Sequence, residues 1–172
     1  MLLWIGGILG ILIGLILIMT IIGAALPKAH VATRTMQLST PADQVWATIA
    51  DGPGWPSWNP GCKSLDVMPE NEGRPVWKFG DGGRGMTMVV EEFTPPQRMV
   101  TRIADKGLPF GGTWSYEVSP RGTGCEVRLT ENGEIYPPPF RFMARFVFGY
   151  TATIDGFLKA LAKRFGEAAV IG

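Results

Sequence analysis

The first 26 residues of this 172-residue chain contain no charged side chain, and all 16 basic and 15 acidic residues follow Leu26. Residues 2–26 therefore form one uncharged run. A helix rises about 1.5 Å per residue, so about 20 apolar residues cross the hydrocarbon layer of a bilayer. The run predicts a transmembrane anchor over residues 1–27, followed by a single domain over residues 28–172.

A cleaved signal peptide is the alternative interpretation, because Gly23-Ala24-Ala25 has the small residues of a cleavage site. The apolar run exceeds the usual length of about 7 to 15 residues, however, and no basic residue precedes it. Lys28 and Arg34 follow the run, and basic residues are enriched on the cytoplasmic side of membrane helices. We expect a single-pass protein of the cell membrane whose domain faces the cytoplasm.

Three glycines of the predicted anchor, Gly6, Gly10 and Gly14, are spaced by four residues and share one helix face. Small residues at this spacing allow two membrane helices to approach closely, which suggests a homodimer. Glycine is also simply common in membrane helices, so the spacing does not decide between the two interpretations.

The remaining composition excludes several classes of protein. A net charge of +1 offers no basic field for nucleic acid. One histidine, His30, and two cysteines, Cys62 and Cys125, cannot supply an ordinary zinc site or a disulfide framework, and we expect unpaired thiols and no metal. No cofactor fingerprint is present: the glycine-rich residues 80–85 lack the Lys-Ser/Thr ending of a phosphate loop and predict a hairpin.

Short runs with strand character dominate the domain. A β-branched run at residues 30–38 predicts a strand, Ser39-Thr40-Pro41 precedes a predicted helix to about residue 51, and the proline-rich residues 55–60 allow one short helical turn. Turn residues then separate six further strands, at residues 62–68, 74–79, 85–93, 98–104, 112–118 and 125–135. The short connections predict an antiparallel meander, and apolar alternation predicts one buried face.

The end of the chain predicts one long amphipathic helix. Pro137-Pro138-Pro139 suits a helix start, and apolar residues recur at helical spacing from Met143 to Phe165. We expect a helix of about 25 residues, ending near Glu167, that covers the sheet.

This order of elements resembles the START-like helix-grip superfamily, which includes polyketide cyclase/dehydrase and lipid-transport domains. The resemblance spans residues 30–168 and rests on Pro41-Ala42-Asp43-Gln44-Val45-Trp46, on Trp55-Pro56-Ser57-Trp58-Asn59-Pro60, on the Glu-x-x-Pro-Pro run at residues 92–96, and on Gly122-Thr123-Gly124. It implies an α+β fold in which a curved antiparallel sheet of about seven strands wraps around the long C-terminal helix, with two short helices after the first strand.

The resemblance implies a cavity between helix and sheet, and three functions follow from it. The domain binds a hydrophobic small molecule or lipid at the membrane, catalyses a cyclase- or dehydratase-type reaction, or serves as a non-catalytic interaction module. Apolar alternation nominates ligand-binding residues, each of which is alternatively a plain core residue: Trp55, Trp58, Trp77, Phe79, Met86, Met88, Met99, Trp114, Tyr116, Leu129, Met143, Phe146, Tyr150 and Phe157.

A catalytic acid or base has few candidates. Glu131 is in phase with the apolar residues of the last strand and is a weak candidate for moving a proton or anchoring a polar group. One of the adjacent Glu91 and Glu92 also qualifies. A β-bulge at Asn132-Gly133 is the alternative for Glu131, since it would leave the carboxylate in solvent.

Four basic residues, Arg141, Arg145, Lys159 and Lys163, fall on one side of the predicted C-terminal helix, opposite its apolar face. Phe148 lies in the same sector. We expect either an ordinary solvated face or a surface that contacts anionic lipid.

Overall fold

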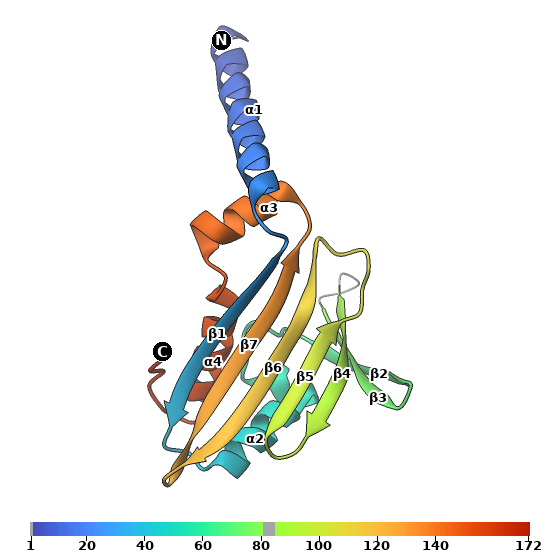
Figure 1. Cartoon of the computed structure of the whole chain (residues 1–172), viewed down its shortest axis with the longest axis vertical. Coiled ribbons are helices and arrows are strands. Elements are labelled where there is room, and N and C mark those ends of the chain that lie inside the picture. Colours follow the sequence, from blue (N-terminus) through green and yellow to red (C-terminus); the bar gives the residue numbers. More distant parts are fainter. Residues whose placement is uncertain (1, 81–84) are drawn as a thin grey trace.

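A computed structural model describes residues 2–80 and 85–172, so most of the glycine-rich segment at residues 80–85 lies outside the described residues. Helix α1 (Leu2–Ala25) extends away from the remainder of the chain (Figure 1). Within the described residues it is the single helix long and apolar enough to cross a membrane, a property that signal sequences share.

The predicted antiparallel sheet is confirmed. Its seven strands have the order β1-β7-β6-β5-β4-β3-β2, and every neighbouring pair is antiparallel. The strands are β1 (Ala29–Leu38), β2 (Leu65–Asn71), β3 (Arg74–Phe79), β4 (Met86–Thr94), β5 (Arg98–Ile103), β6 (Phe110–Arg121) and β7 (Gly124–Ile135). Strands β6 and β7 pair without a register shift along their whole length, joined by a tight turn in which Gly122 has a φ of 60°.

Two short helices follow β1, as expected. Helix α2 (Ala42–Ala50) buries Val45, Trp46 and Ile49, and the 3-10 helix η1 (Gly52–Ser57) begins where the Asp51 side chain accepts a hydrogen bond from the backbone N–H of Gly54. The indole N–H of Trp55 donates to the carbonyl of Ile49 over 3.0 Å. This bond fixes the Trp55 ring above the inner face of the sheet.

The C-terminal helix is interrupted, so the expectation of one continuous helix to Glu167 is wrong. Helix α3 (Pro138–Met143) continues into a π-helical segment, η2 (Ala144–Phe148), and α4 (Ala152–Arg164) begins after Gly149. Gly149 has a φ of 77°, which breaks the helical path. The apolar residues keep helical spacing across the break, but the two parts cover different surfaces. Helix α3 packs against α1, and α4 packs against the sheet.

The core lies between the inner face of the sheet and α4. Ile154, Leu158 and Leu161 of α4 are fully buried there against strand residues such as Met36 and Leu129. Both cysteines are free and buried.

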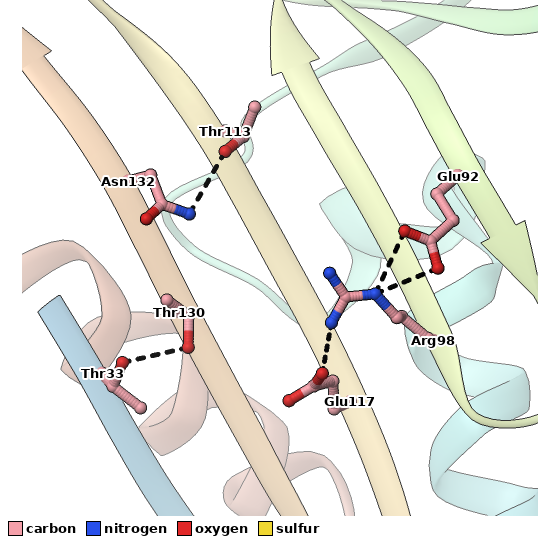
Figure 2. Close-up of polar contacts among 7 residues, drawn as sticks. All are labelled: Thr33, Glu92, Arg98, Thr113, Glu117, Thr130 and Asn132. Carbon is pink, nitrogen blue, oxygen red and sulfur yellow. Dashed lines mark hydrogen bonds and ion pairs between the residues drawn. The ribbon is translucent and has the colours of Figure 1, made fainter. Parts of the chain in front are cut away.

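The opposite face of the sheet is polar. The hydroxyl oxygens of Thr33 and Thr130 lie 3.0 Å apart across two strands. Figure 2 shows this pair and the Arg98 guanidinium between the carboxylates of Glu92 and Glu117. Polar and charged pairs therefore occupy much of the face that points away from α4.

Candidate functional site

A cavity of about 600 Å³ lies between the inner face of the sheet, η1 with the loop that follows it, and α4. Ligand cavities commonly enclose about 300 to 1,000 Å³. The lining is largely apolar and consists of Trp55, Asn59, Pro60, Gly61, Cys62, Phe79, Met86, Met88, Trp114, Tyr116, Leu129, Ala152, Thr153, Ile154, Gly156, Phe157, Lys159, Ala160 and Lys163.

Small residues on α4 create this space. Ala152, Gly156 and Ala160 recur every four residues, so they share the helix face that lines the cavity. A Cβ placed on Gly156 would meet no atom within 4 Å. Larger side chains at these positions would have filled the interior instead.

An aromatic wall centred on Trp55 forms one side of the cavity. The ring centroid of Trp55 lies 5.3 Å from that of Phe157, 5.6 Å from Tyr116, 5.7 Å from Trp77 and 5.8 Å from Phe79. Edge-to-face and tilted contacts of this kind add to the free energy of packing. Burial raises the pKa of the Tyr116 phenol and that of the Cys62 thiol, so both groups stay protonated and neutral at the wall.

Eight of the residues that the sequence nominated for ligand binding do line the cavity: Trp55, Phe79, Met86, Met88, Trp114, Tyr116, Leu129 and Phe157. The strand alternation and the η1 tryptophan placed them correctly on the inner surface. That they contact a ligand stays a prediction.

The other six nominated residues do not line this cavity, contrary to the positions expected from the sequence. Trp77 and Trp58 pack on Trp55 and Phe157 from outside the lining, and Met99 is fully buried in the core. The remaining three are displaced by the break at Gly149: Met143 lies on α3, Phe146 is 59% exposed on η2, and Tyr150 stacks on His30.

Sequence reasoning missed the small residues of α4 and the loop at residues 59–62. The loop has a local signal, since Asn59-Pro60-Gly61 is a turn sequence and the Asn59 side chain accepts a hydrogen bond from the Gly61 N–H over 3.0 Å. The small residues had a signal as well: alanine and glycine at four-residue spacing interrupt the apolar face of α4.

The four basic residues predicted to share one helix face do not share one. Arg141 is only 7% exposed, and its guanidinium donates to the carbonyls of Leu26 and Tyr136, each over 2.9 Å. Arg145 lies on η2, and Lys159 and Lys163 line the mouth of the cavity. These two lysines are the only charged residues among the described lining residues.

A polar cluster lies behind the cavity wall. The Trp114 indole lines the cavity and donates to Glu131 Oε2 over 3.1 Å, and Glu131 Oε1 is 3.5 Å from His30 Nε2. The side chains of His30 and Glu131 are 9% and 12% exposed. The His30 ring stacks on Tyr150 with centroids 4.2 Å apart.

This cluster exists because β1, β7 and β6 stay in register past Asn132. The sheet pairs Gly133 with both His30 and Gly112, and no bulge occurs, so the alternative of a solvated Glu131 is wrong. A Cβ on Gly133 would lie 2.4 Å from the His30 ring. Glycine at this position therefore makes room for the imidazole.

Burial determines the proton affinities in the cluster. It raises the pKa of Glu131, although the Trp114 hydrogen bond opposes this shift, and it lowers the pKa of His30. Among the described residues, His30 Nδ1 has no hydrogen-bond partner. Glu131 can hold a proton at higher pH than an exposed carboxyl, but Trp114 separates it from the cavity.

Glu91 and Glu92 do not point into the cavity, contrary to the second catalytic assignment. Glu91 pairs with Arg102. Glu92 pairs with Arg98 over 3.0 Å on the polar face of the sheet (Figure 2). No group of three potential metal ligands occurs within the described ranges 2–80 and 85–172.

Comparison with solved structures supports the fold. A solution structure from Thermobifida fusca is 22% identical, with a TM-score of 0.65 over 79% of this chain and 93% of that chain. The ZhuI aromatase/cyclase from Streptomyces sp. R1128 is 17% identical, with a TM-score of 0.63 over 81% and 97%. A START superfamily protein from Mycobacterium smegmatis is 17% identical, with a TM-score of 0.58 over 78% and 96%.

Curated proteins offer no significant match to this chain. The family model described as polyketide cyclase / dehydrase and lipid transport matches residues 29–166, which include every strand, the aromatic wall, the cavity and α4. The chain therefore belongs to the polyketide cyclase/dehydrase and lipid transport family.

Proposed function

We propose that this protein binds an amphiphile, a molecule with a hydrophobic body and an anionic end, in the cavity between the sheet and α4, and that α1 holds it in the cell membrane. The observation that carries the proposal is the composition of the cavity: a largely apolar lining with two lysines as its only described charges. A chemical reaction is not needed for this role.

The wall of the cavity suits a hydrophobic body. Each methylene group moved from water into such a site contributes about 0.8 kcal/mol. Met86 and Met88 lie beside the aromatic wall, and flexible thioether side chains adapt to ligands of irregular shape. This favours a lipid or isoprenoid-like molecule recognised by its bulk.

The mouth of the cavity suits an anionic end. Lys159 and Lys163 are four residues apart on α4, so their side chains lie on the same face. Both are exposed, and neither forms an ion pair with any carboxylate of the described residues. A carboxylate or phosphate at the mouth could accept hydrogen bonds from both ammonium groups.

Membrane anchoring by α1 supports a lipid-related ligand. Lys28 and Arg34 favour a cytoplasmic domain, and a removed signal sequence is the competing role of α1. A homodimer through Gly6, Gly10 and Gly14 stays a hypothesis: a Cβ at each position would meet nothing within 4 Å, so this helix face is open to a partner.

An enzyme of the cyclase or dehydratase type is the second candidate. It is favoured by one observation, the buried Glu131 whose raised pKa suits proton transfer and whose partner Trp114 lines the cavity. The third candidate, an interaction module with a filled interior, is disfavoured by the size of the cavity.

Filling the cavity tests the proposal. Gly156→Phe places a ring in open space, and Gly156→Ala is the matched control that adds only a methyl group. Native mass spectrometry of the full chain in mild detergent, with hexadecanoate added, should show a bound adduct in the wild type and the Ala variant and its loss in the Phe variant. Methyl hexadecanoate, which lacks the charge, should bind the wild type less.

Equal adducts in the Phe and Ala variants would place hexadecanoate outside the cavity and refute the proposed site. Equal binding of the acid and the ester would refute the proposed role of the two lysines but would leave the proposed site in the cavity standing. A bound hydrophobic molecule that is recovered with an altered mass after incubation would favour the second candidate, a cyclase- or dehydratase-type enzyme.

A further inference from the structure

Large apolar side chains are exposed around the junction of α1 with the rest of the chain. Figure 1 shows α3 at the base of α1, beside the adjoining ends of β6 and β7. We call the following residues the junction patch, and each is more than two-fifths exposed: Phe110, Tyr136, Phe140, Phe146, Val147 and Phe148. Exposed apolar patches of this kind commonly mark an interaction surface.

The members of the patch are held together by the local fold. Phe110 and Ile135 are paired where β6 begins and β7 ends, and the backbone N–H of Tyr136 donates to the carbonyl of Pro109 over 3.0 Å. Phe140, Phe146, Val147 and Phe148 follow on α3 and η2. The patch therefore spans the start of β6, the segment after β7, α3 and η2, and of these α3 packs against α1.

The end of α1 is fixed against this surface. A Cβ on Gly23 would lie 1.8 Å from the carbonyl oxygen of Pro138, so only glycine allows this approach of α1 to α3. Arg141 donates to the carbonyl of Leu26, and the backbone N–H of Ile135 donates to that of Lys28 over 2.8 Å. The patch consequently lies at the depth where α1 leaves its apolar stretch.

Basic side chains border the patch, together with one carboxylate. Lys106 and Arg145 are exposed shortly before Phe110 and Phe146 in the chain, and the Lys28 carbonyl accepts the Ile135 N–H. The exposed Glu134 accepts a hydrogen bond from the Tyr136 hydroxyl over 2.8 Å. Aromatic residues gather at the interface of a bilayer, and basic residues beside them attract anionic headgroups. A water-facing surface would instead leave several aromatic rings exposed without a partner.

We infer that the junction patch is a second membrane-binding surface, which lies in the interfacial layer of the bilayer that α1 crosses, with its apolar side chains among the acyl chains. The inference rests on the proposed anchoring by α1, because the junction fixes the patch relative to that helix. Its occupant is the lipid bilayer. Four residues beyond Phe148, α4 begins with Ala152 and Thr153 of the cavity lining, so this surface brings one end of the cavity to the lipid.

The test uses the full chain reconstituted in vesicles of phosphatidylcholine and phosphatidylglycerol. Phe148→Cys provides a labelling site for the fluorophore NBD, and the native cysteines are buried. Val67→Cys on β2 is the control, since Val67 is 64% exposed and lies outside the patch. We expect a blue-shifted NBD emission at position 148 that nitroxide-labelled lipids quench, and neither effect at position 67.

Alkaline carbonate extraction of the same vesicles separates the inference from the proposed anchoring. If the chain stays in the membrane while NBD at position 148 reports water and is not quenched, the inference is overturned and the anchor stands. If the blue shift resists nitroxide lipids and grows with protein density, a second copy of the chain covers the patch, which also overturns the inference. Extraction of the chain overturns both.

Discussion

The contact between Glu131 and His30 depends on the glycine at position 133. Because Gly133 has no side chain, His30 can reach Glu131 across the strand pair. The sequence placed Glu131 on the inner face by its phase, but it could not reveal the His30 contact. That contact depends on which strands are neighbours, and β1 and β7 are separated by about 90 residues of chain.

At the scale of this residue we predict that the thermal stability of Glu131→Gln depends on pH differently from that of the wild type. The folded state raises the pKa of Glu131, so folded protein holds a proton that the unfolded chain releases, and wild-type stability falls as pH rises through this range. Glutamine can still accept the Trp114 hydrogen bond, but it does not titrate, so the variant does not lose stability in this way as the pH rises. Thermal unfolding in detergent should show the variant's Tm rising relative to wild type as the pH increases above the ordinary pKa of a glutamate, about 4.3.

Glu70→Gln, on the exposed strand β2, is the control for this series. Its Tm difference from wild type should stay the same across the pH range. A constant difference for Glu131→Gln as well would contradict the buried, proton-holding carboxyl.

The C-terminal elements show where reasoning from periodicity ends. A helical repeat of apolar residues marks which side chains are buried, but it does not say against what. Met143 and Phe157 share a phase, yet one lies on α3 and the other faces the cavity. The strands were easier to predict because strict alternation and turn residues are local, as at Trp114, Tyr116 and Val118.

At this scale we predict opposite effects for two glycine-to-alanine changes. Gly149 has a φ of 77° and a ψ of 157°, a conformation nearly restricted to glycine, so Gly149→Ala should destabilise the protein by about 1–3 kcal/mol. Gly156 lies within α4 with free space around it, so Gly156→Ala should stabilise by up to about 1 kcal/mol. Thermal unfolding of both variants measures these effects. An unchanged Tm in Gly149→Ala would contradict the glycine-specific conformation at the break between η2 and α4.

For the whole molecule, Arg141 joins α1 to the helix-grip fold. The sequence suggested an outer arginine that faces either solvent or anionic lipid, because helical phase alone places it opposite the apolar residues. Its burial follows from the packing of α3 on α1, which sequence periodicity does not reveal. There its guanidinium donates to the carbonyl of Leu26, just after α1, and to that of Tyr136, just after β7. A buried cation here links elements that are 115 residues apart.

We predict that Arg141→Met loosens this junction without unfolding the sheet. Hydrogen bonds to charged groups contribute about 1.5–3 kcal/mol each, so amide exchange of Ile135, whose N–H bonds to Lys28, should accelerate about tenfold or more. Hydrogen–deuterium exchange of the full chain measures this. Arg145→Met is the matched control on exposed η2 and should leave the rate unchanged; equal rates in both variants would mean that Arg141 does not hold the junction.

Strand β2 ends the seven-stranded sheet with one unpaired side, and its sequence makes that edge a poor template for other chains. Pro69 removes a hydrogen-bond donor, the pairing with β3 is irregular between Met68 and Asn71, and Asp66 and Glu70 add negative charge. Such an edge resists the sheet-to-sheet aggregation to which open β-sheets are prone. Under the proposed anchoring by α1, that resistance matters most because a membrane would crowd many copies into a single plane.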